Sequence, residues 1–236
     1  MSFYKPFIYD LRLDGKTAII TGGTSGIGNA IAKMFLWKGA NVVILGSRKT
    51  TPDIAADILT EVTAKVVSET GAAVSATVKG IRTDLRDSSQ IRKAVEQTIN
   101  WYGSIDILVN CAGVGCDASA LDITEEEFNN VLNMNLKAAF LMAQAVGREM
   151  INAGNGGRII NITSDAGTLG IPELVAYSAA KAGLNSVTRT LAVEWGKYGI
   201  TTNAVAPTVV LTPMSKDNWV GERAKKRMEQ IPEADF

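Results

Sequence analysis

The 236-residue sequence contains no histidine, and this absence removes several kinds of catalytic site. A Ser-His-Asp hydrolase needs an imidazole as its general base, and most zinc enzymes need one as a metal ligand. We therefore expect no metal site, and any proton transfer must use another side chain.

Cysteine is almost as scarce, because the chain has only Cys111 and Cys116. Their spacing matches neither a Cys-x-x-Cys redox pair nor a four-ligand zinc site. We interpret both as ordinary thiols.

The sequence also lacks an excess of charge of one sign and lacks long apolar runs. Lys and Arg total 24, as do Asp and Glu, so no net field favours nucleic acid or an anionic membrane. No run approaches the roughly 18 apolar residues of a membrane span, and the amino end lacks the apolar core of a signal peptide. We expect a cytoplasmic protein whose partner is a small molecule.

Apolar strand-like runs alternate with amphipathic helical stretches almost throughout the chain. This alternation predicts an α/β fold with a Rossmann-like, doubly wound parallel sheet and helices on both faces. The length suits a single domain over residues 1–236, with an extension at 1–12 and a substrate loop or lid at 207–236. Strands are expected at 17–20, 41–45, 74–79, 105–110, 157–163 and 200–206, and helices near 26–38, 52–70, 88–102, 125–153 and 175–198.

A glycine-rich segment, Thr21-Gly-Gly-Thr-Ser-Gly-Ile-Gly28, joins the first expected strand to the first helix. Its glycines permit a tight turn and let phosphates approach the backbone, while the helix amino end presents free N–H groups to a pyrophosphate. The segment predicts a nucleotide site that includes Gly22, Thr24, Ser25, Gly26, Ile27 and Gly28.

The second strand ends in Gly46-Ser47-Arg48, where an NAD-selective fold usually has an acidic side chain for the ribose 2′-hydroxyl. That carboxylate is missing, and Ser47 with Arg48 suits a 2′-phosphate. We therefore favour NADP(H) over NAD(H). The alternative is that Arg48 only caps a solvated loop and the site accepts both cofactors.

Two further segments are candidate contacts for the adenosine half of the cofactor. Asp84, followed by Leu85, can accept a hydrogen bond from the adenine amino group, or it can start the next turn. Asn110, Ala112 and Gly113 end the fourth strand with small residues that let the backbone approach the cofactor.

Tyr177 and Lys181 lie one helical turn apart, which places both side chains on one helix face. The ordinary pKa of tyrosine is about 10, so its use as an acid or base near neutrality needs a nearby cation. Lys181 supplies that charge, and Ser164 offers a hydroxyl to hold a carbonyl oxygen. The pair alone is common by chance, but beside the glycine segment it indicates an oxidoreductase.

Together these motifs resemble the short-chain dehydrogenase/reductase family. The residues that carry the resemblance are the glycine segment, Asn110-Cys-Ala-Gly113, Tyr177-Ser-Ala-Ala-Lys181, and Ser164 at 177 − 164 = 13 positions before the tyrosine. The resemblance implies that Ser164 polarises the substrate oxygen and Tyr177 passes the proton. Lys181 would hold the ribose hydroxyls and lower the tyrosine pKa, and Asn135 would hold a water in a proton relay.

The segment Pro207-Thr-Val-Val-Leu-Thr212 resembles the family's nicotinamide-binding stretch, in which Pro207, the Val210 backbone and the Thr212 hydroxyl would meet the carboxamide. Thr208 stands where the family usually has glycine. The family continues with a further helix and a last strand, which we expect this chain to lack. We also expect a homo-oligomer, a dimer or a tetramer, that uses helices 125–153 and 175–198.

Within the family, the segments 140–151 and 206–214 and then Trp219 look most like polyol and sugar-alcohol dehydrogenases. We expect hydride transfer between nicotinamide and a secondary alcohol or ketone, in a polyol or sugar. One alternative is a 3-oxoacyl-[acyl-carrier-protein] reductase, with a docking patch made by Arg223, Lys225, Lys226 and Arg227. Another is a non-catalytic nucleotide-binding protein, although the intact set of Asn135, Ser164, Tyr177 and Lys181 argues against it.

Overall fold

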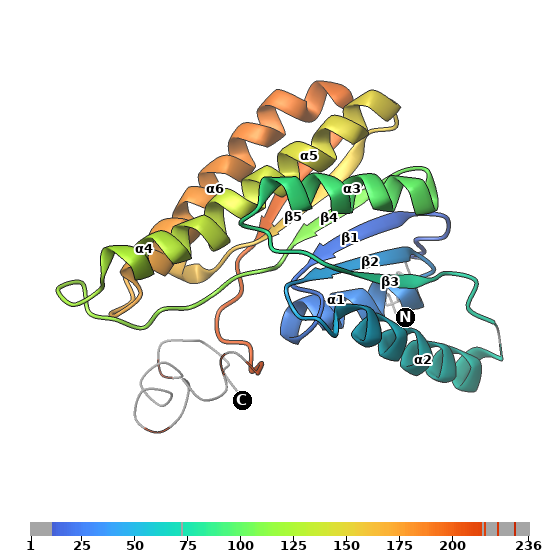
Figure 1. Cartoon of the computed structure of the whole chain (residues 1–236), viewed down its shortest axis with the longest axis horizontal. Coiled ribbons are helices and arrows are strands. Elements are labelled where there is room, and N and C mark those ends of the chain that lie inside the picture. The colour runs from blue at the N-terminus through green and yellow to red at the C-terminus, as the bar shows by residue number, and fades with distance from the viewer. Residues whose placement is uncertain (1–10, 72, 214, 216–220, 222–228, 230–236) are drawn as a thin grey trace, which may run out of the picture.

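The computed structural model describes residues 11–71, 73–213, 215, 221 and 229, and its centre is one parallel β-sheet. Six strands lie in the order β3-β2-β1-β4-β5-β6, and every neighbouring pair is parallel (Figure 1). The strands are β1 (Thr17–Thr21), β2 (Asn41–Gly46), β3 (Val78–Arg82), β4 (Ile107–Asn110), β5 (Gly157–Ile162) and β6 (Ile200–Val205).

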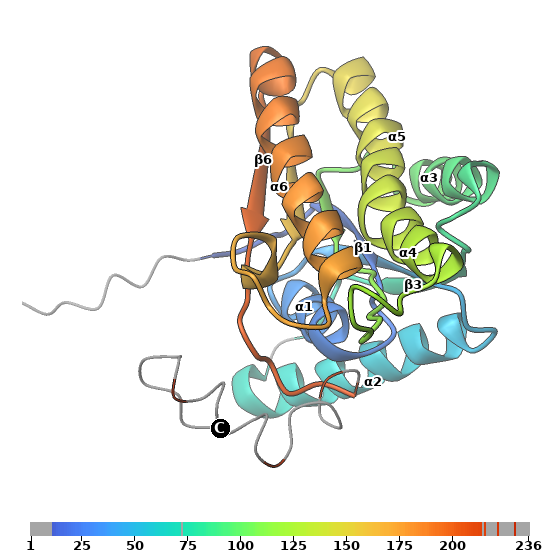
Figure 2. The same ribbon diagram turned by 90° about the vertical axis from the view of Figure 1, so that its left-hand side faces the viewer.

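Helices cover both faces of the sheet, so the prediction of a doubly wound, Rossmann-like single domain is confirmed. The helices are α1 (Gly26–Trp37), α2 (Thr51–Thr70), α3 (Ser88–Tyr102), α4 (Glu125–Leu132), α5 (Ala138–Ala153) and α6 (Val175–Trp195). Figure 2 shows α1 and α2 on one side of the sheet and α3, α5 and α6 on the other.

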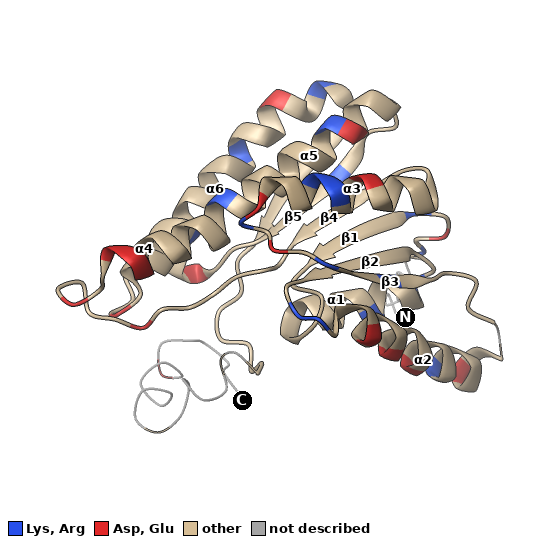
Figure 3. Cartoon of the chain, viewed as in Figure 1, with Lys and Arg blue, Asp and Glu red and all other residues tan. Residues whose placement is uncertain are grey.

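The strands are apolar at successive positions because both of their faces are buried. Ile19 of β1 packs in the core beneath α3 and α5, whereas Ile20 packs in the core beneath α1 and α2. Charged residues of both signs occur along α2 and along α3 (Figure 3), and they are exposed. Within the described part of the chain, no helix is both long and apolar enough to cross a bilayer.

The expected helix over 125–153 forms as one uninterrupted helical run, but a π-helical turn at Asn133–Lys137 divides it into α4 and α5. The start of α4 agrees with its sequence: Thr124 and Glu127 form a reciprocal capping box. A π-helical turn inserts an extra residue into the helix and often marks a functional site. Here it carries Asn135, which is buried.

The third strand runs over Val78–Arg82 instead of the expected 74–79. Its pairing with β2 begins at Val42 and Val78 and ends at Gly46 and Arg82. The strand passes so close to the first turn of α2 that a Cβ at Gly80 would clash with the Thr51 carbonyl. Packing therefore selects a segment that contains glycine over the more apolar residues before it.

The strand order reverses between β1 and β4, and the loops that follow these two parallel strands start at the same edge of the sheet. In open parallel sheets this switch point makes a crevice at the carboxyl ends of the strands. The chain that follows β6 leaves the sheet at this same edge (Figure 1). Met214, Trp219 and the proposed basic patch of Arg223, Lys225, Lys226 and Arg227 lie outside the described residues, as does most of the 1–12 extension.

Candidate active site

A pocket of about 440 Å³ opens at the carboxyl ends of the strands. Loops after β1, β2, β3, β4, β5 and β6 all contribute to its lining, together with α6. The predicted site residues that it brings together are Gly22, Thr24, Ser25, Gly26, Ile27, Gly28, Ser47, Arg48, Leu85, Ala112, Gly113, Ser164, Tyr177, Lys181, Pro207, Val210 and Thr212.

The glycine loop forms one wall of the pocket and fits a diphosphate. Gly22 has a φ of +69°, and a Cβ there would lie 2.9 Å from the Ala112 backbone nitrogen. A Cβ at Gly28 would lie 2.5 Å from the Gly22 carbonyl oxygen. Ser25 precedes α1 and makes no side-chain cap bond within the described residues, so the first amides of α1 can bind an anion.

A buried threonine ties this loop to the loop after β4. The hydroxyl oxygen of Thr21 accepts hydrogen bonds from the Cys111 amide at 2.9 Å and the Ala112 amide at 3.1 Å. The sequence motifs contain all three residues, but they give no sign of this bond. It fixes the distance between the two loops that flank the expected cofactor.

Ser47 and Arg48 lie at the far end of the pocket, after β2, and both are exposed. The turn is held by Thr51, whose hydroxyl donates to the Arg48 carbonyl at 2.7 Å. A second guanidinium is close: Arg82 Nε donates to the Ser47 carbonyl at 3.2 Å. Sequence analysis missed Arg82, because nothing along the chain shows that the end of β3 adjoins the end of β2.

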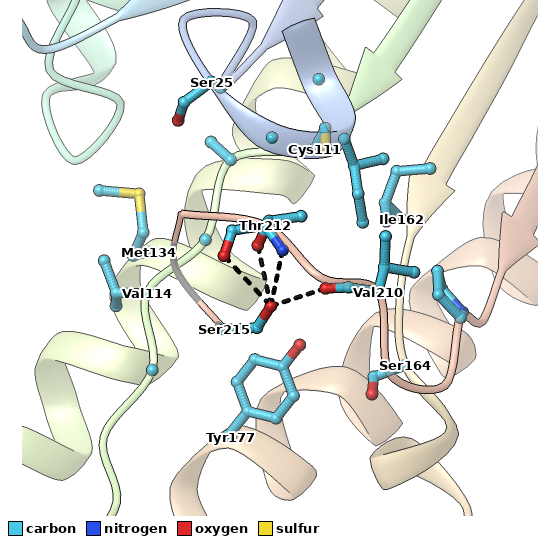
Figure 4. Close-up of a pocket in the computed structure, with 18 of the residues that line it drawn as sticks. Ser25, Cys111, Val114, Met134, Ile162, Ser164, Tyr177, Val210, Thr212 and Ser215 are labelled. Atoms are coloured by element: carbon cyan, nitrogen blue, oxygen red, sulfur yellow. Dashed lines mark hydrogen bonds between the residues drawn. The ribbon is translucent and has the colours of Figure 1, made fainter. Parts of the chain in front are cut away.

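Ser164 and Tyr177 lie close together at the other end of the pocket (Figure 4), and Lys181 also lines the pocket. The short turn after Ser164 packs against α6 so closely that a Cβ at Gly167 would lie 3.0 Å from the Ala182 backbone nitrogen. This contact brings the serine beside the tyrosine. Lys181 Nζ lies 5.5 Å from the centroid of the Tyr177 ring and donates to the Ile162 carbonyl at 2.7 Å.

Burial and nearby polar groups shape the titration of Tyr177. Burial raises the pKa of its phenol, the Ser164 hydroxyl opposes that rise, and the Asp165 carboxylate and the Cys111 thiol add to it. Burial also lowers the pKa of Lys181 to about 8, with the Cys111 thiol opposing. Burial has the largest effect on the Tyr177 pKa in this structure, so a lowering of that pKa by Lys181 stays a prediction.

Asn135 lies beside the pocket without lining it. Its side-chain amide donates to the Val114 carbonyl at 2.8 Å and accepts from the Val114 amide at 2.8 Å. The π-helical turn thus holds the loop after β4 in place against α6. A role for Asn135 in a water-mediated relay stays a prediction.

Asn110 was expected to approach the cofactor, and here the structure differs. Its side chain donates to the Ala139 carbonyl at 3.0 Å and to Asn161 Oδ1 at 2.9 Å, away from the pocket. Asn161 in turn donates to the Thr188 hydroxyl at 2.9 Å. This buried network joins β4, β5, α5 and α6, so Asn110 supports the site without lining it.

Asp84 does not line the pocket either, whereas its neighbours Thr83 and Leu85 do. Its carboxylate accepts from the Arg86 backbone amide at 3.0 Å and from the Arg86 guanidinium at 2.9 and 2.8 Å. These bonds favour the alternative in which Asp84 starts the next turn over a contact with adenine.

Several pocket residues were not predicted: Thr83, Cys111, Val114, Asp117, Met134, Ile162, Asp165, Ile171, Leu174 and Ser215. Asp165 could have been suspected because it follows Ser164 directly. The others lie on segments whose meeting depends on the order of the strands in the sheet. Thr208, which stands in place of a glycine, causes no strain, since Glu173 is the only described non-glycine residue with a positive φ.

Residues 16–223 match the family described as short chain dehydrogenase. The chain belongs to this family. It is 38% identical over 233 residues to a NAD-dependent glycerol dehydrogenase of Listeria innocua serovar 6a, a match that covers 99% of this chain and 85% of that protein. It is 38% identical over 228 residues to a D-threitol dehydrogenase of Mycolicibacterium smegmatis, covering 97% and 83%.

The fold agrees with a solved member of the family. The crystal structure of a dehydrogenase/reductase from Sinorhizobium meliloti 1021 matches with a TM-score of 0.84 at 34% identity, covering 95% of this chain and 83% of that one. This short-chain dehydrogenase is therefore an oxidoreductase that acts on CH–OH groups with NAD(P).

Proposed function

We infer that this short-chain dehydrogenase interconverts a secondary alcohol of a neutral polyol and the corresponding ketone, with NADP(H) preferred over NAD(H). One observation carries this inference: a single pocket joins the glycine loop and Arg48 at one end to Ser164, Tyr177 and Lys181 at the other. The relatives named as glycerol and D-threitol dehydrogenases support the substrate class.

The chemistry follows from the positions of three side chains. When bound, the nicotinamide accepts or supplies the hydride. The Ser164 hydroxyl holds the substrate oxygen, and Tyr177 takes the hydroxyl proton as the alcohol becomes a carbonyl, or returns it in the reverse direction. Lys181 uses one of its three N–H donors on the Ile162 carbonyl, which leaves two for the ribose hydroxyls.

Charges near the reacting end favour a neutral substrate. Asp117 and Asp165 both line the pocket there. Asp117 lies on the loop that meets the start of α6, since the next residue, Ala118, donates its amide to the Glu173 carbonyl at 3.0 Å. Lys181 is the one cation of the described residues at this end, and it is buried. A substrate carboxylate would come close to these two carboxylates, whereas a neutral polyol would bring no like charge into the site.

A steady-state assay of the purified protein tests this function. The panel holds glycerol, threitol, sorbitol and their ketones, an aldonate, and a 3-oxoacyl thioester, each with NADP(H) and NAD(H). We expect polyols to exceed the aldonate in kcat/KM by about fivefold or more, since a partly exposed like-charge contact costs on the order of 1 kcal/mol. Preference for the thioester would overturn the substrate class and support the carrier-protein alternative.

The cofactor preference predicts a selective effect of Arg48→Ala. A charge-assisted hydrogen bond contributes about 1.5 to 3 kcal/mol, so the variant should bind NADPH roughly 10- to 100-fold more weakly while its affinity for NADH changes little. Fluorescence titration with both reduced cofactors measures this difference.

Lys49→Ala is the matched control, because Lys49 is an exposed cation beside Arg48 that does not line the pocket. It should leave both affinities unchanged. Equal losses for NADPH and NADH in Arg48→Ala would contradict the 2′-phosphate contact.

We also propose that the protein is cytoplasmic and forms a homodimer or a homotetramer. Its support is apolar surface on one part of the molecule: Val193 of α6 is 83% exposed, and Tyr198, which follows α6, is also exposed. Contacts through α4, α5 and α6 would cover this surface.

A further inference from the structure

Ser215 lies at the centre of a small hydrogen-bond network over the pocket (Figure 4). Its hydroxyl oxygen is 2.6 Å from the Val210 carbonyl oxygen, 2.9 Å from the Thr212 amide nitrogen and 3.1 Å from the Thr212 hydroxyl oxygen. It is also 3.4 Å from the Thr212 carbonyl oxygen. All three residues line the pocket.

The direction of each bond follows from counting protons. A serine hydroxyl has one proton to donate and two lone pairs to accept with. Carbonyl oxygens only accept, so the Ser215 proton goes to a carbonyl, and the Val210 oxygen is the nearest. The Thr212 amide only donates. The hydroxyl of Thr212 must therefore donate its own proton to Ser215.

This leaves the lone pairs of the Thr212 hydroxyl for a ligand. Thr212 lies against the glycine loop, since a Cβ at Gly26 would be 3.3 Å from Thr212 Cβ. The hydroxyl thus faces the bound cofactor as an acceptor whose proton is already used. An acceptor binds an amide NH₂ group, and it gains nothing from a ligand that offers only a carbonyl or a methyl group.

We propose that Ser215 is a positioning residue that fixes the Thr212 hydroxyl as a hydrogen-bond acceptor and so makes the site select the carboxamide NH₂ of nicotinamide. The proposal rests on the proposed function and on the expected contact between Thr212 and that carboxamide. Without the Ser215 hydroxyl, the Thr212 hydroxyl can rotate and donate instead, and the selection is lost.

The test is a binding measurement on the full chain without substrate. Reduced NADP and its 3-acetylpyridine analogue, in which a methyl group replaces the NH₂, are titrated by calorimetry, and the ratio of the two Kd values is the readout. The wild-type protein should bind the analogue roughly 5- to 100-fold more weakly, because a lost bond and an unpaired acceptor cost about 1 to 3 kcal/mol.

Three variants then separate positioning from general structure. Ser215→Ala should bring the ratio close to one, and Ser215→Thr, which keeps a hydroxyl, should restore it. Thr212→Val removes the acceptor and should also bring the ratio of the two Kd values close to one. This variant gives a second test if Ser215→Ala is poorly folded. A loop that only needs Ser215 for its shape would weaken both ligands equally and leave the ratio unchanged.

The outcomes also separate this proposal from the proposed function. If the wild-type protein binds neither reduced NADP nor reduced NAD, the function itself fails. If it binds them and the ratio in Ser215→Ala equals that of the wild type, Ser215 does not set the polarity of Thr212 and this proposal is wrong.

Discussion

Replacing Tyr177 by phenylalanine should lower kcat by about 10²- to 10⁴-fold while the Kd for NADPH stays within about twofold. The change removes one oxygen atom and keeps the ring, so the pocket keeps its shape. General acid–base catalysis by a positioned side chain contributes about 10²- to 10⁴-fold, and the chain has no histidine to replace the phenol. Steady-state kinetics and a fluorescence titration of the cofactor measure the two quantities separately.

The pH dependence of the rate is an independent test of the role of Tyr177. Burial raises the pKa of Tyr177, so the phenolate that accepts the alcohol proton forms only as the pH rises. The rate of alcohol oxidation by the wild-type enzyme should therefore increase through the alkaline range, and the residual activity of Tyr177→Phe should lose this dependence.

Tyr198→Phe is the matched control, because this exposed tyrosine follows α6 and does not line the pocket. It should have wild-type kinetics. Wild-type turnover in Tyr177→Phe would show that another group transfers the proton.

Much of this site could be predicted from the sequence because its residues form contiguous motifs. The glycine loop needs only the order strand, turn and helix, and Tyr177 and Lys181 need only one helical turn. Physical constraints of short range fix both features, so reading along the chain finds them.

The contacts that the sequence did not predict depend on which segments meet in space. Asn110 ends a strand in the expected place, but its side chain hydrogen-bonds to buried groups on β5 and α5. A buried side-chain amide needs hydrogen-bond partners, and here those partners lie away from the pocket. Arg82 approaches Ser47 only because β3 pairs with β2. The strand order decides such contacts, and no local pattern reports it.

The pKa of Tyr177 is a third case of this kind. A helical spacing of four residues correctly predicts that Lys181 lies near the tyrosine. It does not predict that Lys181 is buried, with only 4% of its surface exposed. Burial weakens the charged form of the lysine and the charged form of the tyrosine together, so proximity alone does not give the direction of the shift.

Lys181→Met should have two large effects, one on catalysis and one on the pH dependence of stability. It should lower kcat/KM by about 10² to 10⁴, because the two N–H donors available for the ribose and the nearby cation are lost. It should also change how the free energy of unfolding depends on pH. Burial lowers the pKa of Lys181 to about 8 in the folded protein, whereas an unfolded lysine titrates near its ordinary value of 10.5.

The sign follows from the protons bound. Between pH 8 and about 10.5 the unfolded chain binds more protons at this lysine than the folded protein does, so Lys181 makes the free energy of unfolding rise with pH. The full rise is on the order of 3 kcal/mol, since one pKa unit corresponds to about 1.4 kcal/mol. Urea unfolding at several pH values between 7 and 10, without cofactor, measures it.

Subtracting the variant from the wild type cancels the titrating groups that do not interact with Lys181. The difference in unfolding free energy should favour the wild type increasingly as the pH rises from 8 to 10. Lys93→Met, at an exposed position of α3, is the control and should show a difference that does not change with pH. A constant difference for Lys181→Met as well would mean that the folded protein keeps this lysine charged. In that case the cation would be available to Tyr177 throughout, and the original expectation of a lowered phenol pKa would regain its physical basis.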